Sequence, residues 1–158
     1  MIGGKPHRPK PGSKTESIVR NGTIQKIITL FKEALHGLGA GVSPTQLEAL
    51  AAMVHEAMTV QARSFHTPEH IFELSDASHP IQALAALFHD VVYYEIDQGF
   101  TPDIQRVLAP YIQETDGQLN LTEGVSRKDV LYYLTLDIFG YRPGQLLVPA
   151  QGQNEFLS

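Results

Sequence analysis

The chain has 158 residues, of which 42% are hydrophobic and 18% charged, and this is the size of one domain. It contains no cysteine, which excludes thiol catalysis, CxxC redox chemistry and cysteine zinc sites. The net charge of −5 hides an asymmetry: residues 1–32 carry seven Lys or Arg and one acid, whereas residues 33–158 carry five Lys or Arg, sixteen acids and six of the seven histidines. Such an acidic, histidine-rich body suits a metal cation better than a polyanion, so nucleic acid is not an expected partner.

The first 16 residues are expected to form a disordered basic tail. They contain three prolines, three glycines and four Lys or Arg, and too little apolar surface to order themselves. No hydrophobic segment of the kind found in a secretory signal follows them. Because no apolar run in the chain reaches the roughly 18–20 residues of a membrane span, we expect a cytoplasmic protein without a membrane partner.

Two amphipathic helices are predicted next along the chain. Apolar residues recur at helical spacing from Thr23 to Leu38. Ser43, Pro44 and Gln46 then supply an N-cap, a first-turn proline and a capping-box partner for a second helix that runs to about Val60.

Two histidines fall on these helices. At 100° per residue, His36 and His55 each lie opposite the apolar stripe of their helix. We therefore expect both to be solvated and to take no part in a site.

Four further helices complete the predicted fold. They are expected from Thr67 and Pro68 through Leu74, from Pro80 to about Tyr94, from Thr101 and Pro102 through Ile112 with a kink or break at Pro110, and from Ser126 to Phe139 before Gly140. No segment alternates with period two over more than a few residues, so the fold class is all-α, a single-domain helical bundle of about six helices over residues 17–158. Pro149 could open another helix, but the chain stops at Ser158 without a C-cap or polar tail, so a shortened form of a longer protein is left open.

Chemistry-bearing residues gather in two segments, RSFHTPEH from Arg63 to His70 and LFHDVVY from Leu87 to Tyr93. In the second segment, His89 and Asp90 interrupt a helix that is otherwise apolar. A buried carboxylate is costly unless a cation or a full set of donors compensates it. An imidazole beside a carboxylate suits a divalent Mn, Fe, Zn or Mg ion.

A second carboxylate also interrupts an apolar helical pattern. Asp137 has Val130 and Leu134 as its angular neighbours on the last predicted helix, so it is expected to be a charge set into an apolar face. Asp129, at the start of that helix, has an ordinary explanation as a capping-box acid. Asp137 is therefore the preferred distal metal ligand, and Asp129 is the alternative.

These segments resemble a known family. An upstream His, then His-Asp on an apolar helix, then a distant Asp is similar to the H…HD…D signature of the HD superfamily of metal-dependent phosphohydrolases. RSFHTPEHI and ALAALFHDVVY resemble, more narrowly, a small bacterial subgroup with R-x-YH-N-x-x-H and FHDxxY segments. The resemblance implies an HD-type bundle over residues 17–158 and the following roles: His66, His89, Asp90 and Asp137 as metal ligands, His70 as a further ligand or a donor to substrate, and Arg63 as a phosphate contact.

The function that this resemblance implies is hydrolysis of a small phosphorylated substrate, a phosphomonoester or phosphodiester such as a nucleotide, by a metal-activated water. Asp90, His70 and Arg63 would be the catalytic residues. The alternative is a catalytically inactive HD-type module that binds a nucleotide or metal for regulation. An inverted zinc-peptidase motif, HxxEH with Glu69 as the base, is also present in form, but it leaves the His-Asp pair unexplained. A homo-oligomer is left open.

Overall fold

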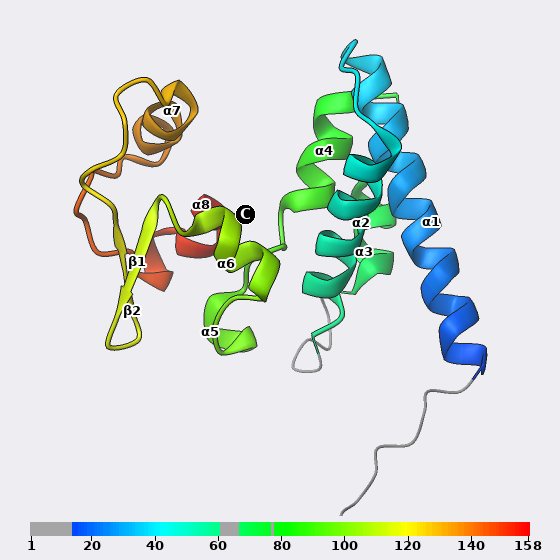
Figure 1. The fold of residues 1–158 in the computed structure, drawn as a ribbon, viewed down its shortest axis with the longest axis horizontal. Coiled ribbons are helices and arrows are strands. Elements are labelled where there is room, and N and C mark those ends of the chain that lie inside the picture. Colours follow the sequence, from blue (N-terminus) through cyan, green and yellow to red (C-terminus); the bar gives the residue numbers. More distant parts are fainter. Residues whose placement is uncertain (1–13, 61–66, 77) are drawn as a thin grey trace, which may run out of the picture.

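The structure is a computed structural model that describes residues 14–60, 67–76 and 78–158, with side chains from residue 22 onward (Figure 1). It is mostly helical, as expected from the sequence. Its elements are α1 (Lys14–Gly37), α2 (Pro44–Met58), α3 (Pro68–Leu74), α4 (Pro80–Phe88), α5 (Tyr94–Asp97), α6 (Pro102–Leu108), β1 (Ile112–Thr115), β2 (Gln118–Leu121), α7 (Val130–Phe139), the 3-10 helix η1 (Pro149–Gln151) and α8 (Gln153–Leu157). The described residues thus form eight α-helices and a two-stranded sheet, which corrects the expected strand-free bundle of about six helices.

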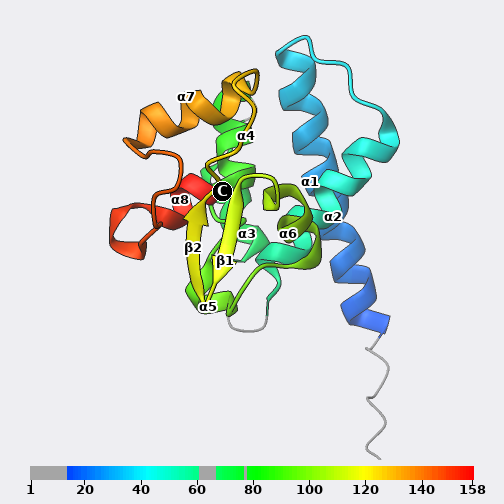
Figure 2. The same cartoon turned by 60° about the vertical axis from the view of Figure 1, so that its left-hand side comes forward.

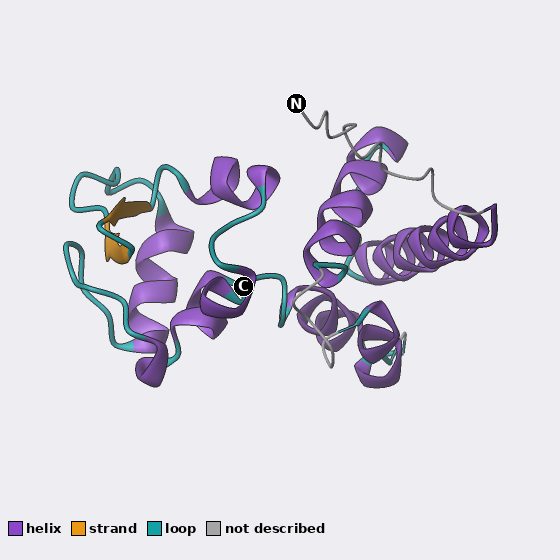
Figure 3. Ribbon diagram, turned by 90° about the horizontal axis from the view of Figure 1, so that it is seen from below, coloured by secondary structure: helices purple, strands orange, loops and turns teal. Residues whose placement is uncertain are grey.

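The elements form two groups, which Figures 1 and 3 separate clearly. Helices α1 to α4 lie together on one side, and the sheet with α6, α7 and α8 lies on the other. The backbone that follows α4 connects the two groups. The His-Asp pair singled out in the sequence begins this connection.

Helix α1 organises the first group, because it packs along both α2 and α4. Ile27 and Phe31 on α1 are almost fully buried, and the Phe31 ring meets the edge of Phe88 on α4 with ring centroids 5.5 Å apart. Gly37 ends α1 so close to Pro80 that an added Cβ would lie 2.6 Å from the proline Cγ. The absence of a side chain at this position lets the end of α1 meet the start of α4.

Helix α4 ends at Phe88, earlier than the sequence indicated. His89 is its C-cap, and Val91 and Val92 are buried without being helical. The backbone amide of Val92 donates to the Ser158 hydroxyl at 3.1 Å instead of to a carbonyl one turn back. Tertiary hydrogen bonds from the α8 region therefore replace helical ones, and an apolar pattern alone cannot reveal them.

The antiparallel pair β1 and β2 is the element that the sequence analysis missed; the strands run side by side in Figure 2. A two-residue turn joins them, with Asp116 at φ 53° and Gly117 at φ 74°. Positive φ at both positions is the type I′ geometry that an Asp-Gly pair favours. This Asp-Gly pair was the available signal, but a helix was predicted through Ile112, whereas α6 ends two residues before Pro110.

Helix α7 starts four residues later than predicted. Asp129 is its N-cap, and one carboxylate oxygen accepts from the Tyr132 amide at 3.1 Å while the other accepts from the Tyr111 hydroxyl at 2.8 Å. Gly140 ends the helix with φ 72°, as predicted. Asp129 therefore caps α7 as its N-cap residue, which corrects the expectation that it is the capping-box acid of a helix that Ser126 opens.

Candidate metal centre

Three of the predicted site residues come together where α3 and α4 meet. His70 lies in the first turn of α3, and His89 and Asp90 follow directly after the last turn of α4. One ligand atom from each residue lies within 4.8 Å of the others. This His70, His89 and Asp90 group, called the triad below, could hold a metal ion.

The hydrogen bond of His89 orients its ring as in a metal-binding histidine. Its Nδ1 lies 2.8 Å from the backbone carbonyl of Ala86, an oxygen that can only accept, so Nδ1 carries the proton. The lone pair is then on Nε2. A histidine ligand in proteins typically donates its other ring nitrogen to a carbonyl or carboxylate in this way, which fixes the tautomer and the ring orientation.

The Nε2 atom of His89 has an unusual environment. It is buried and, among the described residues, has no hydrogen-bond partner, although it lies 2.8 Å from Oδ2 of Asp90. The two atoms are close enough but not in hydrogen-bond geometry. In the neutral imidazole, a lone pair and a carboxylate oxygen at this distance repel, and either a proton on the ring or a metal cation relieves the repulsion.

The triad combines burial with access. The side chain of Asp90 is 11% exposed, whereas those of His89 and His70 are 30% and 34% exposed. The two imidazole rings face each other at a tilt of 56°, with centroids 5.4 Å apart. A small ligand could therefore approach from the histidine side while Asp90 remains shielded.

Two predicted site residues, Arg63 and His66, lie outside the described residues. Their roles as phosphate contact and upstream metal ligand stay predictions. Helix α3 begins at Pro68, and Glu69, the base that the HxxEH interpretation requires, is exposed to solvent.

The structure does not bring Asp137 into the triad. Its side chain is exposed on α7, and its apolar neighbours Val130 and Leu134 are 71% and 52% exposed. The apolar pattern predicted a buried face around Asp137, and the structure corrects this prediction, because that face of the helix is exposed. Asp129 is occupied as an N-cap and does not replace it.

The two histidines that were predicted to be solvated differ in their burial. His36 is exposed as expected, but His55 is only 5% exposed. Helix α2 packs over a wider face than its apolar stripe indicated, since Ala51 is buried beside Val54. The expectation that His55 is solvated was wrong.

A second His-Asp pair lies at the opposite end of α4. His79 is the N-cap residue, and its Nδ1 lies 2.9 Å from Oδ2 of Asp76, with both side chains at least half exposed. Hydrogen bonds from the Ser78 hydroxyl and amide, and then from His79, lower the Asp76 pKa to about 2. This pair belongs to a solvated turn and does not form part of the triad.

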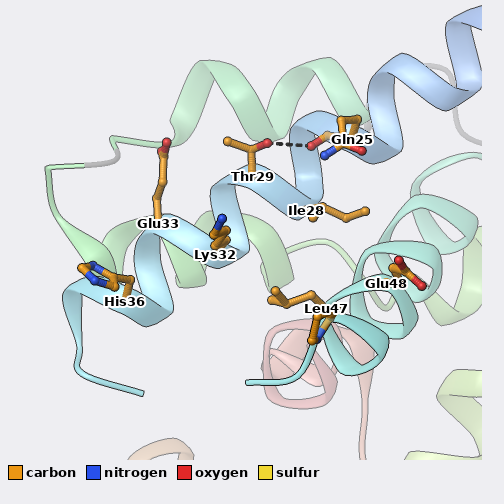
Figure 4. Close-up of a pocket in the computed structure, with 9 residues that line it drawn as sticks. Gln25, Ile28, Thr29, Lys32, Glu33, His36, Leu47 and Glu48 are labelled. Atoms are coloured by element: carbon orange, nitrogen blue, oxygen red, sulfur yellow. Dashed lines mark hydrogen bonds between the residues drawn. The ribbon is translucent and has the colours of Figure 1, made fainter. Parts of the chain in front are cut away.

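A groove of about 520 Å³ runs between α1 and α2 (Figure 4). Lys32, Glu33 and Glu48 supply its charges, His36 also lines it, and each of the four is exposed to solvent. None of its lining residues belongs to the triad. The groove therefore lies apart from the candidate metal centre.

Comparisons with family models, curated proteins and solved structures found no match for this chain. In the part of the chain that the structure describes, no helix has both the length and the apolar character required to span a membrane.

Proposed function

We propose that the triad binds one divalent metal ion and that the protein is an HD-type metal-dependent phosphohydrolase acting on a small phosphomonoester or phosphodiester. The main support for a metal site is the buried Nε2 of His89, which lies 2.8 Å from Oδ2 of Asp90 without a hydrogen bond. The resemblance of the two His-containing segments to the HD signature supports the reaction class.

The donor set fits a transition metal. Two imidazoles and one carboxylate are ligands that Zn and Fe accept, and Mn is also compatible, whereas Mg prefers oxygen ligands. Three protein ligands also leave coordination positions for water and substrate, as in catalytic zinc sites. His66 would add a fourth ligand if it reaches the ion.

The residues around the proposed metal ion then have distinct roles. When bound, the metal supplies a water of lowered pKa and a positive charge beside the phosphoryl group. Ala86 orients His89 through its carbonyl, and the partly exposed His70 shapes the approach to the ion. Arg63, with its planar guanidinium, is suited to bind two phosphate oxygens at once and to orient the substrate.

The metal is tested by elemental analysis of the protein as purified. We expect about one transition-metal ion per chain, lost in His89→Ala and retained in the matched variant His79→Ala, which removes the histidine of the exposed pair. Asp137→Ala should also retain the ion. A wild-type protein that neither contains nor takes up Zn, Mn or Fe would overturn the proposed metal centre.

The reaction is tested separately, by phosphate release from nitrophenyl phosphate monoesters and diesters and from nucleotides. We expect turnover by the metal-loaded protein and a loss of at least about 100-fold in Asp90→Asn, with Asp76→Asn as the matched control. Binding of metal and nucleotide without release of phosphate from any substrate would reject the hydrolase and support the regulatory module instead.

A further inference from the structure

Helix α7 presents an apolar stripe to solvent. Four of its aliphatic side chains are at least half exposed: Val130 at 71%, Leu131 at 75%, Leu134 at 52% and Ile138 at 70%. At 100° per residue these four positions span about 100° of the helix surface. Tyr132 and Leu136, on the opposite side, are buried at 6% and 2% exposure. Helix α7 is therefore apolar on two faces, and only one of them is covered.

Charged residues mark the two ends of this stripe. Asp137 lies in the last turn of α7 and is exposed. Arg127 precedes the helix, and its guanidinium lies 5.4 Å from the centre of the Tyr133 ring. On the helical wheel, Tyr133 and Asp137 lie on the same flank of the stripe, so the contact with Tyr133 places Arg127 on that flank too.

This arrangement is self-complementary. When two helices pack antiparallel about a two-fold axis, each flank of one meets the same flank of the other, end to opposite end. Arg127 of one copy then faces Asp137 of the second copy, and the symmetry forms this ion pair twice. In a parallel two-fold pairing, the two charged flanks would lie on opposite sides of the interface, and neither ion pair would form. The charges therefore favour a second copy of this chain, packed antiparallel.

We propose that the chain forms a symmetric dimer in which the Val130, Leu131, Leu134 and Ile138 stripes of two α7 helices pack antiparallel, with Arg127 and Asp137 paired across the interface. The proposal is independent of the metal centre. A helix of ten residues is about 15 Å long, so this contact by itself is smaller than a standard interface of about 1,600 Å². The dimer is therefore expected to be weak and concentration-dependent.

The oligomeric state of the full chain tests this proposal. Sedimentation equilibrium from micromolar to millimolar concentration should show the average mass rising from that of one chain toward that of two. Leu131→Glu and Ile138→Glu should each remain monomeric throughout, because each would bury a carboxylate in an apolar contact. Ile81→Glu, at a 74% exposed position on α4, is the matched control and should dimerise as the wild type does.

The charge pair is tested by reversal and exchange. Arg127→Glu and Asp137→Arg should each weaken the dimer about tenfold or more, because each opposes like charges twice. The double variant that carries both changes should recover the wild-type dimer. These exposed substitutions leave the buried face of α7 intact, and circular dichroism checks that each variant is folded. A wild type that stays monomeric at every concentration, a dimer unaffected by Ile138→Glu, or a double variant no better than the single ones would overturn the proposal.

Discussion

His79 and His89 lie at opposite ends of α4, and each has an Asp oxygen within 2.9 Å of a ring nitrogen. The His79 pair is solvated and forms part of a hydrogen-bonded turn with Ser78. In the His89 pair, Asp90 is shielded, and the His89 ring is oriented by a backbone carbonyl. The two pairs share the same residue types but differ in ring nitrogen, hydrogen bonding and exposure, so the His79 pair is a control for the His89 pair.

Added metal is expected to stabilise the protein through the buried pair alone. A metal at about 100 times its Kd contributes about 2.7 kcal/mol to the unfolding free energy, which raises Tm by about 5–10 °C in a chain of this size. Thermal melts of chelator-treated protein with added Zn or Mn should show this rise in the wild type and in Asp76→Asn. Asp90→Asn should show none, and an equal rise in both variants would contradict the assignment of the site.

The contribution of the His79 and Asp76 pair to the unfolding free energy is expected to depend on pH. The Asp76 pKa is about 2 in the folded chain against an ordinary value of 3.8, so its stabilisation is fully present above about pH 4 and is lost as the pH falls through about 2. Urea unfolding of wild type and Asp76→Ala should show a small difference that is constant from pH 7 to pH 5 and shrinks below pH 4. The difference is small because both groups are solvated. A difference that grows toward low pH would have the wrong sign.

Helix α8 is expected to stabilise the segment that follows the triad. Gln153 is 3% exposed and donates from Nε2 to a carboxylate oxygen of Glu95 at 2.7 Å, across 58 residues of chain. Gln153→Ala should lower the unfolding free energy by about 1.5–3 kcal/mol, as for a hydrogen bond to a charged group. The neighbouring exposed Gln151→Ala provides the comparison, and equal effects of the two substitutions in urea unfolding would reject a role for this contact.

The β1 and β2 turn depends on its glycine. Gly117 has φ 74°, a conformation that costs an L-residue roughly 1–2 kcal/mol, so Gly117→Ala should lower the unfolding free energy by about that amount. Gly124→Ala is the matched control, because Gly124 lacks a positive φ and has nothing within 4 Å of an added Cβ. Its effect should be close to zero in the same urea experiment. A turn that tolerates Gly117→Ala equally well would contradict the observed geometry.

Local signals determined much of the helical fold. Ser43 with Gln46 predicted the capping box of α2, which the structure confirms, and Gly140 predicted the end of α7. These features depend on hydrogen bonds and backbone conformations within a few residues, and a sequence displays them directly. The Asp-Gly pair of the hairpin was equally local, but a competing helical pattern through Ile112 obscured it.

Burial depended on the tertiary structure. Asp90 and Asp137 both interrupt apolar helical patterns, yet Asp90 is shielded beside His89 and His70 while Asp137 lies on an exposed face of α7. An apolar stripe shows that a surface favours a partner but does not say which element supplies it. By itself the sequence thus determined that a His-Asp pair interrupts an apolar segment. The packing of α3 against the end of α4 brought His70 to this pair, because only folding brings residues 19 positions apart within ligand distance.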